Sequence, residues 1–360
     1  MATNSADAQE QQTAPAFRYG AVTHWAQGKE LDWVVDMGLG WVRTGVGWEW
    51  IEPNFTEPPT YHWEIADAIV SDCVARRLNI LWGLPYTPKW ASSNGEQSGY
   101  PKDDVARKHW RMFVHAVVER YIQQITYFEI WNEPNNAKFW QGSVDEFFNY
   151  ILKPAAEEIK AVDPSKQVVA PTLMARADAR ISPDYFIRQL GKLGAANYID
   201  VISQNVYEAT PRDVIDQFEK GDFSCFWIAC KQNYDAFFKL YDEAGMKDKP
   251  VWVTEFGWRT DKVGQKRQAN YLADTLVRFS RRPRFIGAFI YELKDDDRFP
   301  PKWGLVKGDG TPKKSYWKLR NMLWQTLGVE GLMYDDDTFD DDGYGHMIFR
   351  DGNKTNIFTK

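Results

Sequence analysis

The sequence has few cysteines, and they match no common metal-binding pattern. Three of the 360 residues are cysteine. Cys225 and Cys230 stand close enough along the chain to close a small loop, while Cys73 falls in a predicted helix, where we expect a buried free thiol. A structural zinc site uses four Cys or His ligands at characteristic spacings, which these cysteines lack. We therefore expect no metal site.

Long apolar runs and excess positive charge are also missing. No stretch approaches the ~20 apolar residues of a membrane-spanning helix. Residues 1–16 are polar and lack the apolar segment of a signal peptide, so we expect a disordered leader there. The formal net charge of −6 argues against a polyanionic partner such as nucleic acid, because phosphate binding requires a basic surface.

Aromatic residues, by contrast, are abundant. The chain contains 17 Trp, 17 Tyr and 21 Phe. Such a composition is compatible with a large aromatic core. It is equally compatible with a sugar-binding cleft, because Trp and Tyr offer a flat apolar face with a polar edge. Composition alone does not separate these two interpretations.

Short apolar runs alternate with longer amphipathic stretches from about Phe17 onward, which predicts βα units around a parallel sheet. The predicted strands are Arg18–Thr23, Gly40–Val46, Asn79–Leu84, Tyr127–Trp131, Gln167–Thr172, Asp200–Val206, Val251–Phe256 and Phe285–Tyr291. The predicted helices cover residues 67–77, 103–124, 144–162, 182–194, 265–282 and 315–328. The pattern favours a (β/α)8 barrel, an α/β fold, over residues 17–328. A doubly wound sheet is the alternative, but no glycine-rich fingerprint follows the first strand.

The character of the chain changes after Gly328. Residues 329–360 form an acidic, turn-rich extension in which we expect one or two short β-strands. Its run of aspartates lacks the residue order and closing glutamate of an EF-hand loop, so we interpret it as solvated turns.

Two glutamates stand where predicted strands give way to loops. The fourth strand ends in YFEIWNEPN, which contains Glu133, and the seventh ends in VWVTEFGW, which contains Glu255. Active sites of (β/α)8 barrels lie at the carboxyl ends of the strands, so these side chains are expected to face each other across the barrel mouth. Hydrolysis of a glycosidic bond with retention uses two carboxyl groups about 5–5.5 Å apart, one as acid/base and one as nucleophile.

These motifs resemble glycoside hydrolase clan A. WNEP at Trp131–Pro134 and EFGW at Glu255–Trp258 are similar to the segments that end strands four and seven in that clan. The resemblance implies that Glu133 is the acid/base and Glu255 the nucleophile. It also implies that Asn132 hydrogen-bonds the sugar 2-hydroxyl, and that catalysis needs no metal or organic cofactor.

Two further segments resemble family 39-like members of the clan. WVRTGVGWEWIEP implies that Arg43 supports the nucleophile, and LPYTPKWAS places Trp90 near the sugar. The resemblance spans roughly residues 17–328. One departure concerns SQNVY, where Asn205 stands at the place of a common His while Tyr207 keeps the Tyr. The eighth strand ends in YELKDDD, which makes Tyr291 or Glu292 a candidate for a position where many relatives carry a sugar-facing Trp.

Further candidates for substrate contact have structural alternatives. Trp48, Trp90 and Trp258 can contact sugar or belong to the upper core of the barrel. His24, in AVTHW, ends the first strand on the catalytic face, although a lone His more often serves a structural hydrogen bond.

We therefore expect a retaining glycoside hydrolase that cleaves β-glycosidic bonds in a polysaccharide or oligosaccharide, with endo action favoured. The alternatives are an exo-acting, β-xylosidase-like enzyme, a transglycosylase with the same residues, and a barrel that binds carbohydrate without catalysis. A carbohydrate is the expected partner. Because large glycans are mostly extracellular, we expect secretion or a periplasmic location; the sequence does not define the oligomeric state.

Overall fold

The computed structural model describes residues 17–175, 179–224, 231–233, 235–298, 301–326, 333–334, 347–351 and 354–358. Cys225, Cys230, the leader and most of the acidic extension lie outside these residues. Cys73 is buried in α3 as a free thiol, as predicted. Within the described residues, no helix has the length and apolar character needed to cross a bilayer.

Eight parallel strands form the barrel, which confirms the predicted fold class. They are β1 (Arg18–Val22), β2 (Trp41–Thr44), β3 (Asn79–Gly83), β4 (Tyr127–Glu129), β5 (Gln167–Val169), β6 (Ile202–Val206), β9 (Val251–Phe256) and β10 (Phe285–Ile290). Their order is β5-β4-β3-β2-β1-β10-β9-β6, and parallel bridges from Val169 to Val201 and from Met174 to Asn205 join the two end strands. Every predicted strand overlaps an observed one.

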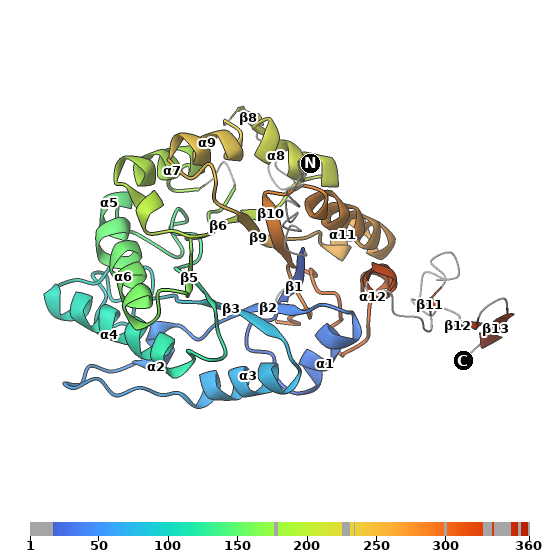
Figure 1. The fold of residues 1–360 in the computed structure, drawn as a ribbon, viewed down its shortest axis with the longest axis horizontal. Helices are drawn as coiled ribbons and strands as arrows, with labels where there is room; N and C mark the ends of the chain where they lie inside the picture. Colours follow the sequence, from blue (N-terminus) through green and yellow to red (C-terminus); the bar gives the residue numbers. More distant parts are fainter. Residues whose placement is uncertain are drawn as a thin grey trace, which may run out of the picture.

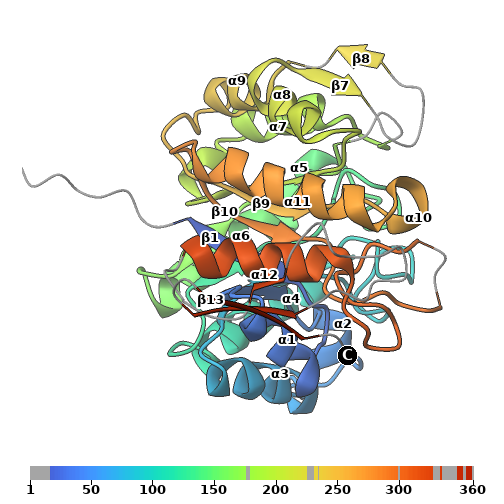
Figure 2. The ribbon, with the colours of Figure 1, turned by 90° about the vertical axis from the view of Figure 1, so that its right-hand side faces the viewer.

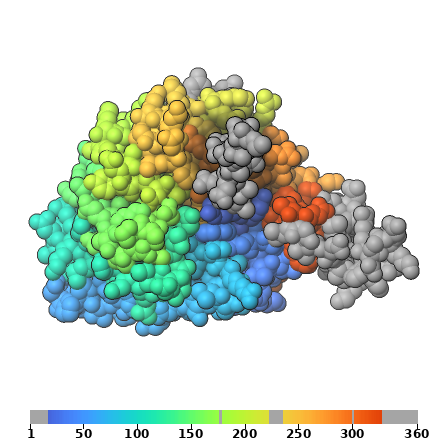
Figure 3. Space-filling model, viewed as in Figure 1, coloured from blue at the N-terminus to red at the C-terminus, as the bar shows by residue number. Residues whose placement is uncertain are grey.

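The helices surround the strands (Figure 1). They are α1 (Lys29–Asp36), α2 (Trp48–Ile51), α3 (Glu64–Ala75), α4 (Asp104–Arg120), α5 (Val144–Phe147), α6 (Lys153–Val162), α7 (Pro183–Lys192), α8 (Pro211–Glu219), α9 (Phe237–Glu243), α10 (Thr260–Val263), α11 (Gln265–Ser280) and α12 (Lys314–Thr326). A π-helical turn, Phe148–Leu152, joins α5 to α6, and a 3₁₀ turn, Ala195–Asn197, precedes β6. Helices α11 and α12 lie side by side (Figure 2), and α4 packs against α6 (Figure 3).

Short β-strands lie outside the barrel. β7 (Asp222–Ser224) pairs antiparallel with β8 (Lys231–Asn233). In the C-terminal extension, β11 (Met333–Tyr334), β12 (Met347–Asp351) and β13 (Lys354–Phe358) form a small antiparallel sheet.

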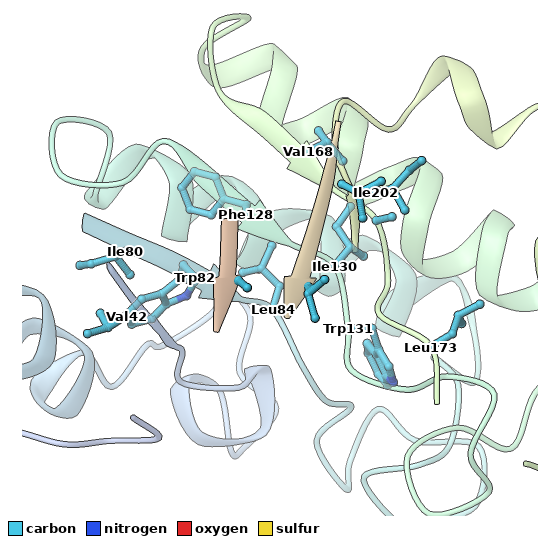
Figure 4. Packing of buried hydrophobic residues seen from close by; sticks show 14 of the residues in the cluster. Val42, Ile80, Trp82, Leu84, Phe128, Ile130, Trp131, Val168, Leu173 and Ile202 are labelled. Atoms are coloured by element: carbon cyan, nitrogen blue, oxygen red, sulfur yellow. The ribbon is translucent and has the colours of Figure 1, made fainter. Parts of the chain in front are cut away.

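Side chains that alternate along the barrel strands divide the core into two layers. Those that point outward, such as Val42, Trp82 and Ile202, pack beneath the helices (Figure 4). Those that point inward fill the lower barrel and form a separate cluster that includes Leu81 and Trp252. Each fully buried aliphatic or Phe side chain stabilises the fold by about 1.5–3 kcal/mol. The filled lower barrel keeps a substrate out of that end of the barrel.

A β-bulge in β9 interrupts this alternation. Val253 pairs with Gln204 of β6, but the next pair is Glu255 with Asn205, so Thr254 is an extra residue. With strict alternation, Glu255 would share the outward side of Val253, because successive side chains point to opposite faces. The extra residue turns Thr254 and Glu255 both toward the barrel interior. The bulge therefore aims the Glu255 carboxylate into the site.

Candidate active site

A cleft of about 1040 Å³ opens at the carboxyl ends of the strands. Its walls come from the loops that follow the barrel strands, as is usual for this fold. The predicted site residues that line it are His24, Arg43, Asn132, Glu133, Tyr207, Glu255 and Tyr291. The volume lies at the upper limit of about 300–1,000 Å³ that is common for drug-sized ligands, so the cleft has room for more than one sugar unit.

Glu255 is held by hydrogen bonds to both carboxylate oxygens. Nη1 of Arg43 donates to its Oε1 at 2.6 Å, and the Tyr207 hydroxyl donates to its Oε2 at 2.6 Å. Two such donors fix the position of both carboxylate oxygens. The arrangement suits a carboxylate nucleophile of fixed orientation.

Arg43 connects the nucleophile candidate to strand β4. Its Nε donates to Glu129 at 2.7 Å, and its Nη2 donates to Oδ1 of Asn132 at 3.0 Å. The guanidinium is buried, and the carboxylates of Glu129 and Glu255 raise its pKa despite that burial. The planar fork of arginine thus positions three side chains at once, which an ammonium group cannot reproduce.

Glu133 lies in a different environment. Burial and the nearby charge of Glu255 raise the pKa of Glu133 to about 7. Asn205 donates to its Oε1 at 3.1 Å, and Asn136 donates to its Oε2 at 3.2 Å. Glu133 also has a φ of 45°. Such a left-handed backbone conformation is uncommon for a residue other than glycine. Strained residues of this kind cluster at functional sites.

Asn205 has a definite place in this network, which the sequence did not reveal. The hydroxyls of Thr172 and Thr254 lie 2.9 and 3.1 Å from its Oδ1. They orient the amide so that its Nδ2 points at Glu133. Asn205, which stands where the clan commonly has a His, therefore contacts the acid/base candidate Glu133. Tyr207 contacts the nucleophile candidate Glu255.

His24 and Glu292 form a pair at the cleft. Nε2 of His24 lies 2.9 Å from Oε2 of Glu292, and the His24 ring lies edge-on to Tyr291 with centroids 5.8 Å apart. The His24 side chain is 60% exposed, whereas Glu292 is buried. His24 is therefore accessible to a substrate, and Glu292 orients it.

The expected sugar contacts of three tryptophans do not fit their positions. Trp48 and Trp258 are fully buried, and their indole nitrogens donate to Glu52 and to the carbonyl of Glu208. Trp90 packs against Trp48 and donates to the carbonyl of Glu52 at 3.0 Å. None of the three lines the cleft. They belong to the packing beneath the loops, which was the structural alternative.

Several residues that line the cleft were not predicted from the sequence. They are Trp25, Glu49, Trp50, Tyr86, Phe139 and Trp303. All but Trp303 lie within a few residues of a predicted strand end or motif, a position that could have identified them. The acidic run Asp295–Asp297, which follows β10, also lines the cleft and divides into separate ion pairs: Asp295 is buried against Lys313 at 2.8 Å, and Asp297 contacts Lys302 at 3.0 Å.

Arg43→Lys should reduce kcat by about 10²-fold, the size of effect expected when reacting groups are misplaced by about 1 Å. Lysine keeps the positive charge but cannot bond Glu129, Glu255 and Asn132 together. Steady-state kinetics of the purified variant measure the loss. Arg76→Lys, in an exposed ion pair with Asp32, is the matched control and should retain wild-type kcat. A wild-type kcat for Arg43→Lys would contradict the positioning role.

Known proteins share this fold and parts of this sequence. A β-xylosidase of Geobacillus stearothermophilus is 24% identical over 208 residues, which cover 51% of this chain and 41% of that protein. The chain thus spans about two fifths of the length of that relative. A family 39 glycoside hydrolase from the gut symbiont Bacteroides cellulosilyticus WH2 has a similar structure, with a TM-score of 0.64, 22% identity, and coverage of 95% of this chain and 69% of that one.

A monomeric β-xylosidase from Caulobacter crescentus CB15 is also similar in structure, with a TM-score of 0.64, 15% identity, and coverage of 95% of this chain and 72% of that one. At these identities the structural similarity establishes the fold. The model of the family "Glycosyl hydrolases family 39" matches residues 42–276, which is more than half of the chain. The resemblance to family 39-like enzymes is thereby confirmed, and the chain belongs to glycosyl hydrolases family 39.

Proposed function

We propose that the protein hydrolyses β-glycosidic bonds with retention, with Glu133 as acid/base and Glu255 as nucleophile. The observation that carries the proposal is the contrast between the two carboxyl groups in one cleft. Burial and a neighbouring negative charge hold the pKa of Glu133 at about 7, whereas Arg43 and Tyr207 bond both oxygens of Glu255. Different environments for two carboxyl groups are what acid and nucleophile roles require.

The reaction proceeds in two displacements. The Glu255 carboxylate attacks the anomeric carbon and forms a glycosyl ester, while the bond to the leaving oxygen breaks and Glu133 donates its proton to that oxygen. Glu133, now ionised, then takes a proton from water. The water oxygen attacks the anomeric carbon, and Glu255 departs as a carboxylate.

Asn132 is suited to hold the sugar at the cleaved bond. Its Oδ1 accepts from Arg43, its amide also hydrogen-bonds Tyr86, and the second hydrogen of Nδ2 can donate to a sugar hydroxyl. Because the same guanidinium binds Glu255, Asn132 and the nucleophile are positioned by one side chain. A hydrogen bond that strengthens in the transition state adds to catalysis by differential binding.

We further propose endo action on a polysaccharide or oligosaccharide, which the size of the cleft supports. Exo action is the second candidate, because one relative is a β-xylosidase. Product analysis on β-linked polysaccharides and oligosaccharides distinguishes them: endo action releases fragments of several lengths early, whereas exo action releases one small product throughout. Binding of glycans without any cleavage would contradict the hydrolase proposal.

A further inference from the structure

Two exposed tryptophans form part of the cleft wall. Trp25 follows β1 and Trp50 lies in α2, after β2; their rings meet edge to face with centroids 5.2 Å apart. The two residues are 37% and 53% exposed. Among the exposed large apolar side chains in the described part of the chain, only these two line the cleft. Both tryptophans are therefore exposed at a place where a substrate in the cleft can contact them.

Both rings are held in place. Nε1 of Trp25 donates to the carbonyl of Gly45 at 2.8 Å. The Trp50 side chain hydrogen-bonds Glu49, whose carboxylate also accepts from the backbone nitrogen of Tyr86 at 2.9 Å. Gly47 provides the space for this carboxylate, because a Cβ at that position would lie 2.4 Å from Oε2 of Glu49. Groups fixed before binding lose little conformational entropy when a ligand arrives.

The chemistry of this wall suits a pyranose ring. An indole presents an apolar face to the C–H groups of a sugar and keeps a polar edge for hydrogen bonds. Glu49 supplies a polar group beside the rings. Burial raises the pKa of Glu49 to about 7, so near neutral pH its carboxyl can donate as well as accept hydrogen bonds to sugar hydroxyls.

The tryptophans lie beyond the groups that surround the cleaved bond. Trp25 follows His24, whose ring packs edge-on against Tyr291. The Tyr291 ring in turn lies edge-on to the ring of Tyr207, with centroids 6.1 Å apart, and the Tyr207 hydroxyl donates to Glu255. The wall therefore runs from the nucleophile through Tyr291 and His24 to the tryptophan pair.

We propose that Trp25 and Trp50, together with the Glu49 carboxyl, form a second sugar-binding subsite, which takes a pyranose unit beyond the one whose bond is cleaved. This inference rests on the proposed function. It specifies that the substrate is an oligosaccharide or polymer whose additional units contribute to recognition.

The test compares long and short substrates in Trp50→Ala and Trp25→Ala. For each variant, kcat/KM is measured with β-linked xylo- and cello-oligosaccharides of increasing length and with the corresponding aryl β-monoglycosides. The ratio of kcat/KM for the tetrasaccharide to that for the monoglycoside should fall about tenfold, which corresponds to the loss of one stacking contact. Trp50→Phe keeps a flat ring and should restore part of the ratio. Tyr185→Ala, at a 57% exposed position on α7 outside the cleft, should leave it unchanged.

An unchanged ratio in both alanine variants, with the wild type active, would overturn the subsite and leave the proposed function intact. A loss that is equal for both substrates would also overturn it, because it would indicate a structural role for the tryptophans. If the wild type cleaves nothing, the proposed function fails, and calorimetric titration with the same oligosaccharides decides the subsite. Weaker binding by Trp50→Ala than by wild type would support it, and equal binding or no binding would overturn it.

Discussion

Glu255→Gln should lower kcat on every glycoside by on the order of 10⁴-fold or more, the effect of removing a nucleophile that no other group replaces. The amide has the size of the carboxylate but cannot form the glycosyl ester. It also removes the negative partner of Arg43, which lies 2.6 Å away. Because a buried guanidinium then loses one counter-charge, thermal unfolding should be recorded beside the kinetics, so that lost activity is not confused with lost structure.

The matched control is Glu119→Gln, at an exposed position near the C-terminal end of α4. It carries the same chemical change and should keep wild-type kcat. A folded Glu255→Gln enzyme with more than a few per cent of wild-type kcat would exclude Glu255 as the nucleophile.

Glu133→Gln should produce a loss that depends on the leaving group. For an oligosaccharide, whose leaving alcohol needs a proton, kcat/KM should fall about 10²–10⁴-fold, the usual contribution of general acid catalysis. For an aryl glycoside with an acidic phenol, the first step needs little protonation and should be nearly preserved. The second step still lacks its general base, so the glycosyl ester should accumulate and give a burst of phenol followed by slow turnover. An equal loss for both substrates would argue against the acid role.

The same carboxyl predicts a pH profile. A folded-state pKa of about 7 keeps Glu133 protonated below neutral pH, because burial and the charge of Glu255 disfavour its ionised form. For wild type, kcat/KM on oligosaccharides should therefore decline as the pH rises through about 7. Glu133→Gln should lose this basic limb, since glutamine does not titrate. A limb that persists unchanged in the variant would belong to another group.

Most of the barrel was predictable from the sequence because its strands are apolar runs of Val, Ile and aromatic residues separated by amphipathic helices. Ser182 followed by Pro183 is a typical helix start, and the Ser182 hydroxyl accepts from the backbone nitrogen of Tyr185 at the N-terminus of α7. Glu133 and Glu255 were found because each stands at the carboxyl end of a strand. The orientation of Glu255 was not predictable, since it depends on a bulge that only the pairing with β6 defines.

Aromatic side chains of the loops were the least predictable part. Trp48 and Trp50 stand two residues apart in the same short helix, yet one is fully buried and the other is half exposed on the cleft wall. Which face of α2 turns inward depends on its packing against Trp90 and Trp110, which are distant in the sequence. The three side chains that hydrogen-bond Asn205 likewise come from three different strands or strand ends; they are Glu133, Thr172 and Thr254.

The assignment of the two carboxyl groups is tested most directly by azide rescue of Glu133→Ala with an activated aryl β-glycoside. Azide needs no general base, so it should attack the glycosyl ester on Glu255, break that ester bond and restore turnover. The product should be the β-glycosyl azide, since the two displacements together retain configuration. An α-glycosyl azide, or a folded variant with full activity and no azide product, would contradict the roles assigned to Glu133 and Glu255.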